Sequence, residues 1–241
     1  MNTCETPCPV SIRSRVLDSS RSDVWIVIAA YNEGKVIRDV VSEVVRAGWQ
    51  TIVVDDGSRD DTAEAAEIPG VYVLRHVINL GQGAALQTGI DFAVRRGANY
   101  IVTYDADGQH NCADIPDLIA ALDAGADVAL GSRFLGRAIE GASAKRLALL
   151  KTATTVSNTL SGLKLTDAHC GFRGIRATVA PKLRITQDRM AHASELLRKM
   201  KTSGVKVVEI PTTVRYTEHS MAKGQGGMQA VRILFDYFFR A

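Results

Sequence analysis

Short runs of continuous apolar residues alternate along this chain with segments of helical spacing, and this alternation restricts the fold more than any other feature. Residues 24–29 and 128–130 are such runs, and residues 51–54 form a third that begins at Thr51. A run without polar alternation is expected of a strand buried on both faces of a parallel sheet. Between the runs at 24–29 and 51–54, residues 36–45 place apolar side chains at helical spacing, and Gly48 closes that segment. The pattern predicts βαβ units and therefore an α/β fold, with a mostly parallel sheet flanked by helices.

A fourth run, residues 100–104, ends in two carboxylates one residue apart, Asp105 and Asp107. Ligands of open α/β sheets bind outside the carboxyl ends of the strands. Strand alternation would aim both carboxylates the same way, with the small Ala106 pointing elsewhere. Together with the amide of Gln109 they form an oxygen-rich set suited to Mg²⁺ or Mn²⁺ bridging a diphosphate. The alternative is a polar turn, because Asp-Gly is a common turn signal.

A second strand, residues 51–54, also ends in acids, Asp55 and Asp56. With Glu33 and the two acids after residue 104, this edge would repel itself unless cations or hydrogen-bond donors neutralise it. A nucleotide diphosphate with its metal would do so, since ribose hydroxyls or base N–H groups could donate to an acid such as Asp56. Glycines in residues 79–83 would let backbone approach such a ligand at a helix N-terminus. That segment is weak evidence, because it is neither GxGxxG nor a Walker lysine motif.

The length of 241 residues fits one large α/β domain or one domain with an extension. In the second half we expect helices over residues 144–160 and 188–200 and a strand or two around residues 205–216. We expect a flexible tail over residues 1–22, which lack the apolar core of a signal peptide, and a single domain over residues 23–225. Residues 226–241 are expected to form an amphipathic helix that touches a membrane interface, docks on a partner, or packs on the protein's own core. Its apolar positions at helical spacing are Val231, Leu234, Phe235 and Phe238.

Charge is divided unevenly along the chain. Residues 1–136 contain 11 Lys and Arg against 19 Asp and Glu, whereas residues 137–241 contain 18 against 7. The basic half is compatible with a membrane or nucleic-acid contact, and also with ordinary solvated faces. The four cysteines show neither zinc spacing nor a CxxC pair, so we expect no disulfide and no metal knuckle. No apolar run approaches the roughly 18 residues of a membrane span, which favours a cytoplasmic protein.

Five motifs stand in the order found in family 2 GT-A glycosyltransferases, which this chain resembles. More narrowly, it resembles the dolichol-phosphate mannosyltransferases and the related bacterial polyprenyl-phosphate glycosyltransferases, as residues 166–173, Arg215 and the downstream Lys223 support. Any one motif is modest evidence, but five in register are highly specific. The five are residues 30–33 (AYNE), 53–58 (VVDDGS), 79–83 (NLGQG), 105–110 (DADGQH) and 131–134 (GSRF).

The resemblance implies roles for individual residues. The metal ligands would be Asp105, Asp107 and Gln109. The catalytic residues would be Asp107, Arg133, Asp167 and Arg215. The residues that bind the nucleotide-sugar would be Ala29, Tyr31, Glu33, Asp55, Asp56, Gly81, Asp105, Ala106, Arg133, Arg215 and Lys223.

The chain departs from the family pattern in three places. Ala29 stands where many relatives have proline. The spacing from Arg215 to Lys223 is about two residues longer than in the mannosyltransferases, which makes Lys223 the least secure assignment. We also expect none of the hydrophobic C-terminal spans that many bacterial relatives have.

The implied activity is metal-dependent transfer of one mannose- or glucose-type sugar, with inversion, from a nucleotide-diphosphate sugar to a dolichyl or undecaprenyl phosphate. The expected partners are the nucleotide-sugar donor, the polyprenyl-phosphate acceptor, and a membrane surface or small membrane protein at the C-terminal helix. We expect no nucleic acid. The expected location is the cytoplasm, peripheral at the cytoplasmic face of the membrane.

Two other functions stay open. The first is sugar transfer to a saccharide hydroxyl in cell-surface polysaccharide synthesis. A phosphomonoester acceptor has a second pKa near ~6, so it is largely ionised at neutral pH and needs no general base. A saccharide hydroxyl would need one, for which Asp167 and Glu195 are candidates. The absence of a Gln-x-x-Arg-Trp motif argues against a processive polysaccharide synthase. The second is a catalytically silent nucleotide-sugar-binding subunit of a membrane complex. Four intact residues argue against it: Asp105, Asp107, Arg133 and Arg215.

Several side chains also have a purely structural interpretation. Arg133, which follows a buried run, could form an internal ion pair. Asp167 could order residues 171–173. His110 follows the metal motif, but we do not expect it to be a ligand.

Overall fold

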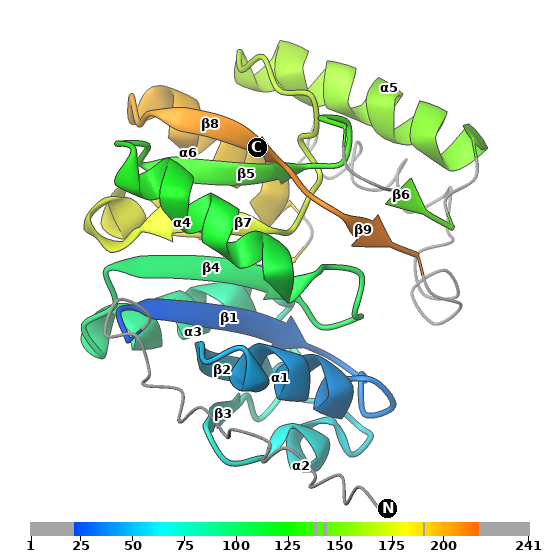
Figure 1. The fold of residues 1–241 in the computed structure, drawn as a ribbon, viewed down its shortest axis with the longest axis vertical. Coiled ribbons are helices and arrows are strands. Elements are labelled where there is room, and N and C mark those ends of the chain that lie inside the picture. Colours follow the sequence, from blue (N-terminus) through cyan, green and yellow to red (C-terminus); the bar gives the residue numbers. More distant parts are fainter. Residues whose placement is uncertain (1–21, 137–138, 142–143, 190, 217–241) are drawn as a thin grey trace, which may run out of the picture.

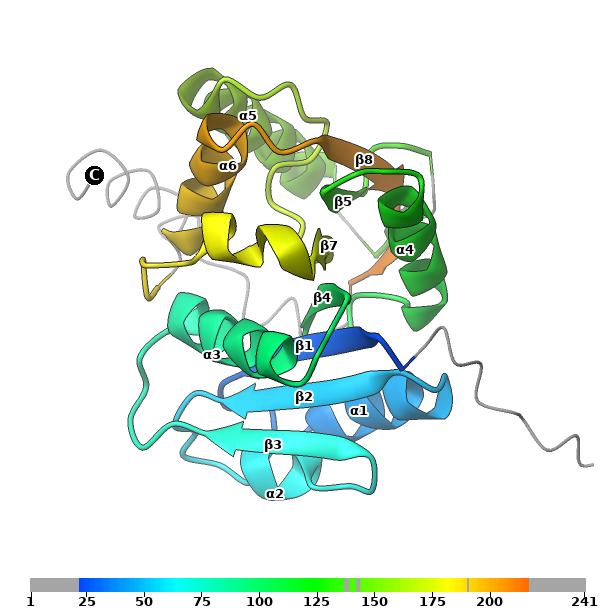
Figure 2. The same ribbon diagram turned by 90° about the vertical axis from the view of Figure 1, so that its left-hand side faces the viewer.

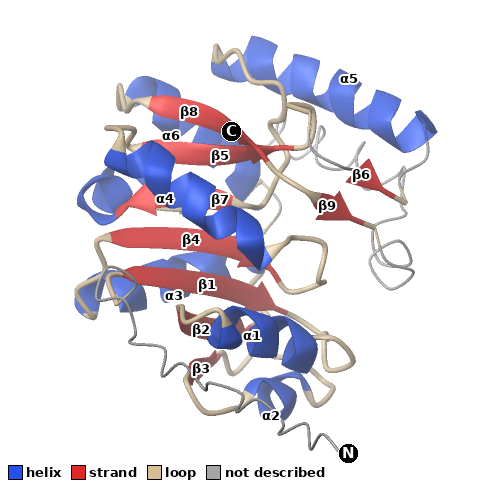
Figure 3. Ribbon diagram, viewed as in Figure 1, coloured by secondary structure: helices blue, strands red, loops and turns tan. Residues whose placement is uncertain are grey.

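The computed structural model describes residues 22–136, 139–141, 144–189 and 191–216, and these form three layers (Figure 1). A seven-stranded sheet lies between helices on its two faces (Figure 3). The strands of this sheet are β1 (Val24–Ala30), β2 (Gln50–Asp55), β3 (Val71–Arg75), β4 (Tyr100–Asp105), β5 (Val128–Ser132), β7 (Arg173–Arg176) and β8 (Val207–Pro211). The helices are α1 (Ile37–Arg46), α2 (Thr62–Ala66), α3 (Gln82–Arg95), α4 (Ile115–Asp123), α5 (Ala144–Ser161) and α6 (His192–Thr202), with 3₁₀ helices η2 (Cys112–Asp114) and η3 (Ala177–Leu183).

The sheet has the order β3-β2-β1-β4-β7-β5-β8 and is parallel except for β7, which runs antiparallel to both of its neighbours. In this register Ala30 of β1 lies opposite Asp55, and Ala29 lies opposite Asp105. The acidic ends of β2 and β4 therefore flank the end of β1 at one edge of the sheet. The predicted α/β fold and the predicted gathering of acids at the carboxyl edge are confirmed.

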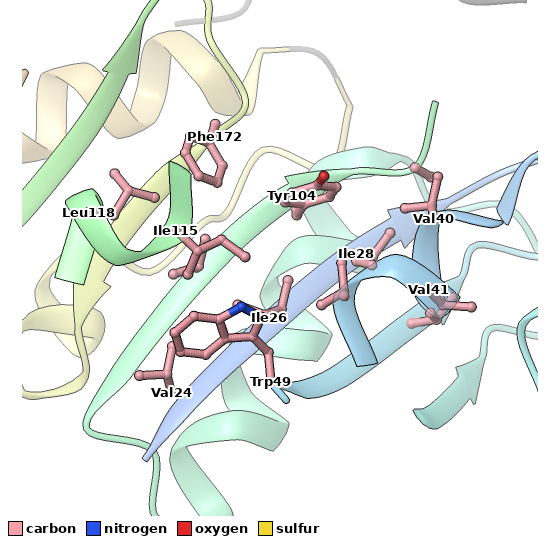
Figure 4. Packing of buried hydrophobic residues seen from close by; sticks show 14 of the residues in the cluster. Val24, Ile26, Ile28, Val40, Val41, Trp49, Tyr104, Ile115, Leu118 and Phe172 are labelled. Atoms are coloured by element: carbon pink, nitrogen blue, oxygen red, sulfur yellow. The ribbon is translucent and has the colours of Figure 1, made fainter. Parts of the chain in front are cut away.

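Alternating side chains of β1 divide the core between the two faces of the sheet. Val24, Ile26 and Ile28 pack with α1 and α4 in the cluster drawn in Figure 4. Trp25 and Val27 point the other way and pack under α3. A third cluster joins β5 and β7 to η3 and α6 on the same face as α3 (Figure 2). Because β1 is buried on both faces, its run is continuously apolar.

The second half of the chain departs most from the expectations. The antiparallel β7 and the short β6 (Ile139–Glu140) were not predicted, whereas β8 and β9 (Val214–Arg215) lie in the segment 205–216 where a strand or two was expected; β9 pairs in parallel with β6. Helix α5 has nearly the predicted bounds of 144–160. Helix α6 begins at His192 rather than at residue 188, because the preceding residues cross the N-terminus of α3, where the Asp188 carbonyl accepts from Gly83 N at 2.7 Å.

Some predictions concern residues that the structure does not describe. The predicted tail, the amphipathic helix at 226–241 and Lys223 all lie outside the described residues, so the proposed division into 1–22, 23–225 and 226–241 stays a prediction. Within the described part of the chain, none of the helices combines the length and the apolar character needed to cross a bilayer.

Candidate active site

The two carboxylates after β4 are held from different sides. Asp105 accepts a hydrogen bond at Oδ2 from His110 Nε2 at 2.8 Å, and one-third of its side chain stays exposed. Asp107 accepts from the Gln109 backbone N–H at 3.1 Å and from the Gln109 side-chain amide at 2.6 Å. Ala106 between them is buried, as alternation predicted. The amide nitrogen of Gln109 is thus directed at Asp107.

The surroundings of these carboxylates separate their pKa values. Burial alone would raise the pKa of Asp105, but the neighbouring His110 and the charge of Arg173 hold it below its ordinary value. Burial raises the pKa of Asp107 to about 6, and the negative charge of Asp105 adds to this rise. Two carboxylates that repel each other at neutral pH form a site that a cation would stabilise.

The donor set fits a hard divalent cation. Among the described residues no three His, Cys, Asp or Glu side chains cluster as a closed metal site. Asp105 and Asp107 would therefore supply two oxygens, and the remaining positions would go to substrate phosphate oxygens and water. Mg²⁺ in particular is commonly held in this way, by one or two carboxylates together with substrate phosphates.

The acids after β2 are in a different situation. Asp55 is fully buried, accepts from Ser58 N at 3.0 Å and lies 3.2 Å from the Arg75 guanidinium. The carboxylate of Asp56 is also buried, and four protein donors surround it at 2.7–3.0 Å. They are His76 Nδ1, Asn79 Nδ2, Leu80 N and Gly81 N. The side chain of Asp56 thus holds the loop that follows β3.

The glycine-rich segment before α3 is contacted closely by the chain itself. A Cβ on Gly81 or Gly83 would come within 3.0 Å of the backbone around Asp188. The Asp188 carbonyl also accepts from Gly83 N and Ala84 N, at 2.7 and 3.2 Å. The expected close approach at this helix N-terminus is therefore present, but its occupant here is residues 187–189. Nucleotide binding by Gly81 stays a prediction.

Arg133 and Asp167 form a buried ion pair. Arg133 Nε and Nη2 donate to the two Asp167 oxygens at 2.6 and 2.7 Å, and Nη1 donates to the Tyr216 hydroxyl at 3.1 Å. Burial alone would lower the pKa of Arg133, but Asp167 raises it above its ordinary value, and the pKa of Asp167 is lowered in turn. The internal ion pair weighed for Arg133 is thus present, with Asp167 as its partner. Ordering of residues 171–173 by Asp167 stays a prediction.

A backbone hydrogen bond joins the loop that contains Asp107 and Gln109 to β9. Arg215 N donates to the Gln109 carbonyl at 2.9 Å, and His110 forms a bridge with Val214. Asp114, just after the loop, accepts from Thr212 Oγ1 at 3.0 Å and from Thr213 N at 2.7 Å. The side chain of Arg215 is exposed. These contacts bring the strand that carries Arg215 and Tyr216 beside the acids after β4.

Three further predicted nucleotide residues lie at the end of β1 or just after it. Ala29 is half-buried in that strand, Tyr31 is exposed, and Glu33 is buried with its backbone N–H donating to Thr62 Oγ1 at 2.8 Å. Sequence reasoning missed the contacts of Tyr216 and His110. Tyr216 had no local signal, whereas His110 follows directly after the metal motif.

Comparison with known proteins settles the family. The sequence model described as Glycosyl transferase family 2 matches residues 25–184. The chain belongs to this family. This glycosyltransferase is 34% identical over 213 residues to polyprenol monophosphomannose synthase of Mycolicibacterium smegmatis, covering 83% of this chain and 80% of that protein. It is 29% identical over 238 residues to UDP-N-acetylglucosamine–dolichyl-phosphate N-acetylglucosaminyltransferase of Methanococcus voltae, covering 88% and 93%.

A solved structure supports the fold assignment. The glycosyltransferase superposes on glucosyl-3-phosphoglycerate synthase from Mycobacterium tuberculosis, crystallised with Mn²⁺, UDP and phosphoglyceric acid, with a TM-score of 0.65. The match covers 91% of this chain and 79% of that one at 18% sequence identity. At that identity the likeness establishes the GT-A fold, and the residue roles in this enzyme rest on its own geometry.

Proposed function

We propose that this glycosyltransferase moves one sugar from a nucleotide-diphosphate sugar to the phosphate of a polyprenyl phosphate. Asp105 and Asp107 would hold Mg²⁺ or Mn²⁺ against the donor diphosphate. When bound, the cation would stabilise the charge that develops on the leaving diphosphate. Arg215 lies on β9 beside these acids, and its guanidinium is suited to the donor or acceptor phosphate. The buried Arg133, bonded to Asp167, would contribute positive charge near Asp105.

The hydrogen bonds and pKa values of two carboxylates favour a phosphate acceptor over a saccharide hydroxyl. A saccharide hydroxyl would need a general base, and Asp167 and Glu195 were the candidates. Asp167 is occupied by Arg133 through both oxygens, and its pKa is lowered. Glu195 accepts from Thr186 N, Gln187 N and Lys199, and these bonds outweigh burial and bring its pKa to about 2. Neither carboxylate is therefore suited to remove a proton at neutral pH. An ionised phosphate acceptor has no proton that must be removed.

The names of the two relatives agree with this acceptor class but not on the sugar. One is a polyprenol monophosphomannose synthase, and the other transfers N-acetylglucosamine from UDP to dolichyl phosphate. We therefore leave the sugar and base of the donor to experiment. On the nucleotide side, Ala29, Tyr31 and Glu33 would line the nucleoside. Asp55, Asp56, Gly81 and Ala106 would support the site, and Lys223 would add a positive charge.

The test is transfer of radiolabelled sugar, from a panel of nucleotide-sugars, into polyprenyl phosphate that is then extracted into organic solvent. We expect label in the lipid phase with Mg²⁺ or Mn²⁺, loss of label with EDTA, and loss in Asp107→Ala. Asp123→Ala, an exposed position at the far end of α4, is the matched control and should transfer normally. Label that stays aqueous would favour a saccharide acceptor, and nucleotide binding without turnover would favour a binding subunit.

The lipid acceptor also suggests where the enzyme works. We place it at the cytoplasmic face of a membrane as a peripheral protein, with residues 226–241 contacting lipid or a small membrane protein. The measurement is flotation with anionic liposomes, comparing the full chain with a chain that lacks residues 228–241. Direct lipid contact is contradicted if the full chain stays in the soluble fraction and the deletion changes nothing.

A further inference from the structure

His110 contacts Asp105 from inside the protein. Its side chain is 3% exposed, whereas that of Asp105 is 33% exposed. The imidazole Nε2 lies 2.8 Å from Asp105 Oδ2. The carboxylate is therefore held by a buried group while part of it faces solvent, where a ligand can reach it.

The tautomer of His110 follows from its contacts. Among the described residues, the buried Nδ1 has no hydrogen-bond partner. If the hydrogen were on Nδ1, a buried N–H would lack an acceptor and the Nε2 lone pair would face a carboxylate. A hydrogen on Nε2 avoids both penalties, since Nε2 then donates to Asp105 and only a lone pair is left unmatched. The hydrogen-bond network therefore assigns the donor to Nε2.

Aromatic rings fix the plane of this imidazole. The Phe172 ring stacks on it at 5.3 Å with an interplanar angle of 28°, and the Tyr104 ring meets it edge-on at 5.5 Å. The Tyr104 hydroxyl also donates to the His110 carbonyl at 2.6 Å. Tyr104 and Phe172 belong to the core cluster of Figure 4, so the ring that supports Asp105 is anchored in the core rather than in a surface loop.

The backbone of Gly171 closes the other side of Asp105. A Cβ on this glycine would come within 3.0 Å of both carboxylate oxygens. The Gly171 carbonyl accepts from Thr103 Oγ1 at 2.6 Å, which ties this backbone to β4. Asp105 thus lies between a hydrogen-bond donor and a backbone wall, and both are rigidly attached to the sheet.

We propose that His110 is a positioning residue of this glycosyltransferase, whose Nε2–H fixes the carboxylate of Asp105 in the orientation that receives the divalent cation. The inference rests on the proposed function through the metal role of Asp105. Groups that hydrogen-bond to metal ligands orient them, and their loss typically lowers metal affinity 10- to 100-fold. His110 acts through Asp105 and does not itself touch the metal.

Two substitutions separate the donor from the ring. His110→Phe keeps an aromatic ring between Phe172 and Tyr104 but removes the donor, whereas His110→Gln keeps an N–H donor and removes the ring. Mn²⁺ affinity is measured on the full chain by the electron paramagnetic resonance signal of unbound Mn²⁺, alone and with UDP or GDP present. We expect affinity to fall about 10- to 100-fold in His110→Phe, and His110→Gln to recover most of that loss. His169→Phe, which removes an imidazole that bonds to Ser157, is the matched control and should bind Mn²⁺ normally.

Kinetics and a second variant test the same point. In the transfer assay, His110→Phe should raise the Mn²⁺ concentration needed for half-maximal rate and recover most of kcat at saturating Mn²⁺. Gly171→Ala, which would displace the carboxylate from the other side, should weaken Mn²⁺ binding as well. If His110→Phe binds Mn²⁺ like the native protein, or if Phe and Gln weaken it equally, the positioning role is wrong. If Asp105→Asn binds Mn²⁺ like the native protein, the proposed metal site itself fails.

Discussion

Two acidic strand ends lie on either side of β1, and they differ in which groups satisfy their carboxylates. After β2, Asp56 is buried and surrounded by four protein donors. After β4, Asp105 and Asp107 are each held by one neighbouring residue, and the pKa of Asp107 is raised to about 6 by burial and by the charge of Asp105. The charge of Asp56 orders a loop, whereas the charges of Asp105 and Asp107 would be available for a ligand.

An acidic motif at a sheet edge therefore does not by itself indicate a ligand contact. A carboxylate offers about four acceptor positions, and protein donors fill those of Asp56. A nucleotide that bonded to Asp56 would have to replace one of them. Asp105 keeps one-third of its side chain exposed and needs no such exchange to bind a cation. Substitutions at the two ends should therefore affect different properties of the enzyme.

The largest effect is expected for Asp107→Asn on activity. Removing one carboxylate of the metal site should lower kcat/KM roughly 10³-fold or more, because cation stabilisation of a leaving diphosphate amounts to several kcal/mol. The melting temperature should stay the same or rise slightly, since the substitution removes a carboxylate that is repelled by Asp105. Transfer assays and thermal unfolding on one preparation check both. A kcat/KM within tenfold of the native value would place the metal elsewhere.

The reverse pattern is expected for Asp56→Asn. The side-chain amide cannot accept from all the donors at this position, so buried N–H groups would lose their partners, at roughly 1–3 kcal/mol each. The free energy of unfolding should fall by roughly 2–4 kcal/mol, as measured by urea denaturation. Glu67→Gln, at an exposed acid just after α2, is the control and should change it by about 0.5 kcal/mol or less. If Asp56→Asn is as stable as the native protein but has lost nucleotide affinity, the contrast between the two strand ends is wrong.

Much of the first half of the fold could be predicted because its physics is local. The strand expected at 51–54 falls within β2, and the apolar run at 24–29 is nearly all of β1, since parallel strands buried on both faces are near-continuously apolar. Strand β7 lacks such a run because it contains two arginines and Gly174. It is inserted between β4 and β5, and a Cβ on Gly174 would lie 3.2 Å from Leu118 Cβ, so α4 packs close over it.

The candidate site likewise has features that the sequence predicts and features that it does not. The placement of the acids at one edge follows from strand order and was predictable. Which acids have protein partners was not, because the donors to Asp56 come from residues 76–81, 20 to 25 residues away. The Asp188 carbonyl that occupies the N-terminus of α3 is about 100 positions from Gly83. The partner of Arg133 Nη1, Tyr216, is 83 residues distant. Such contacts depend on tertiary packing and have no local signature.

Glu195 extends the comparison to a third carboxylate, one with protein partners like Asp56. Burial alone would raise its pKa, but bonds from Lys199, Thr186 and Gln187 bring it to about 2. A lowered pKa contributes stability that is present above the ordinary value near 4.5 and is lost as the pH falls toward 2. Glu195→Gln should therefore destabilise the protein by roughly 2–3 kcal/mol at pH 7. The difference from the native protein should shrink steadily below pH 4.5, as measured by denaturation across pH. A difference that is constant with pH would mean that packing, rather than charge, is lost.

The smallest effect is expected for Gln109. Its substitution tests how much the Mn²⁺ affinity of Asp105 and Asp107 depends on the turn that follows them. The Gln109 amide nitrogen donates to Asp107 Oδ2 at 2.6 Å, which describes a support for a carboxylate rather than a third ligand. Gln109→Met keeps the length of the side chain and the backbone N–H that also donates to Asp107, so Mn²⁺ affinity should fall by about tenfold or less. Gln50→Met, at the start of β2 and the opposite edge of the sheet, is the matched control. A loss as large as that of Asp107→Asn would instead make Gln109 a ligand, and its amide would then have to turn its oxygen toward the cation. In that case the acids at the end of β4 would resemble Asp56 more than the structure indicates. At both places a ligand could bind only by replacing an internal hydrogen bond.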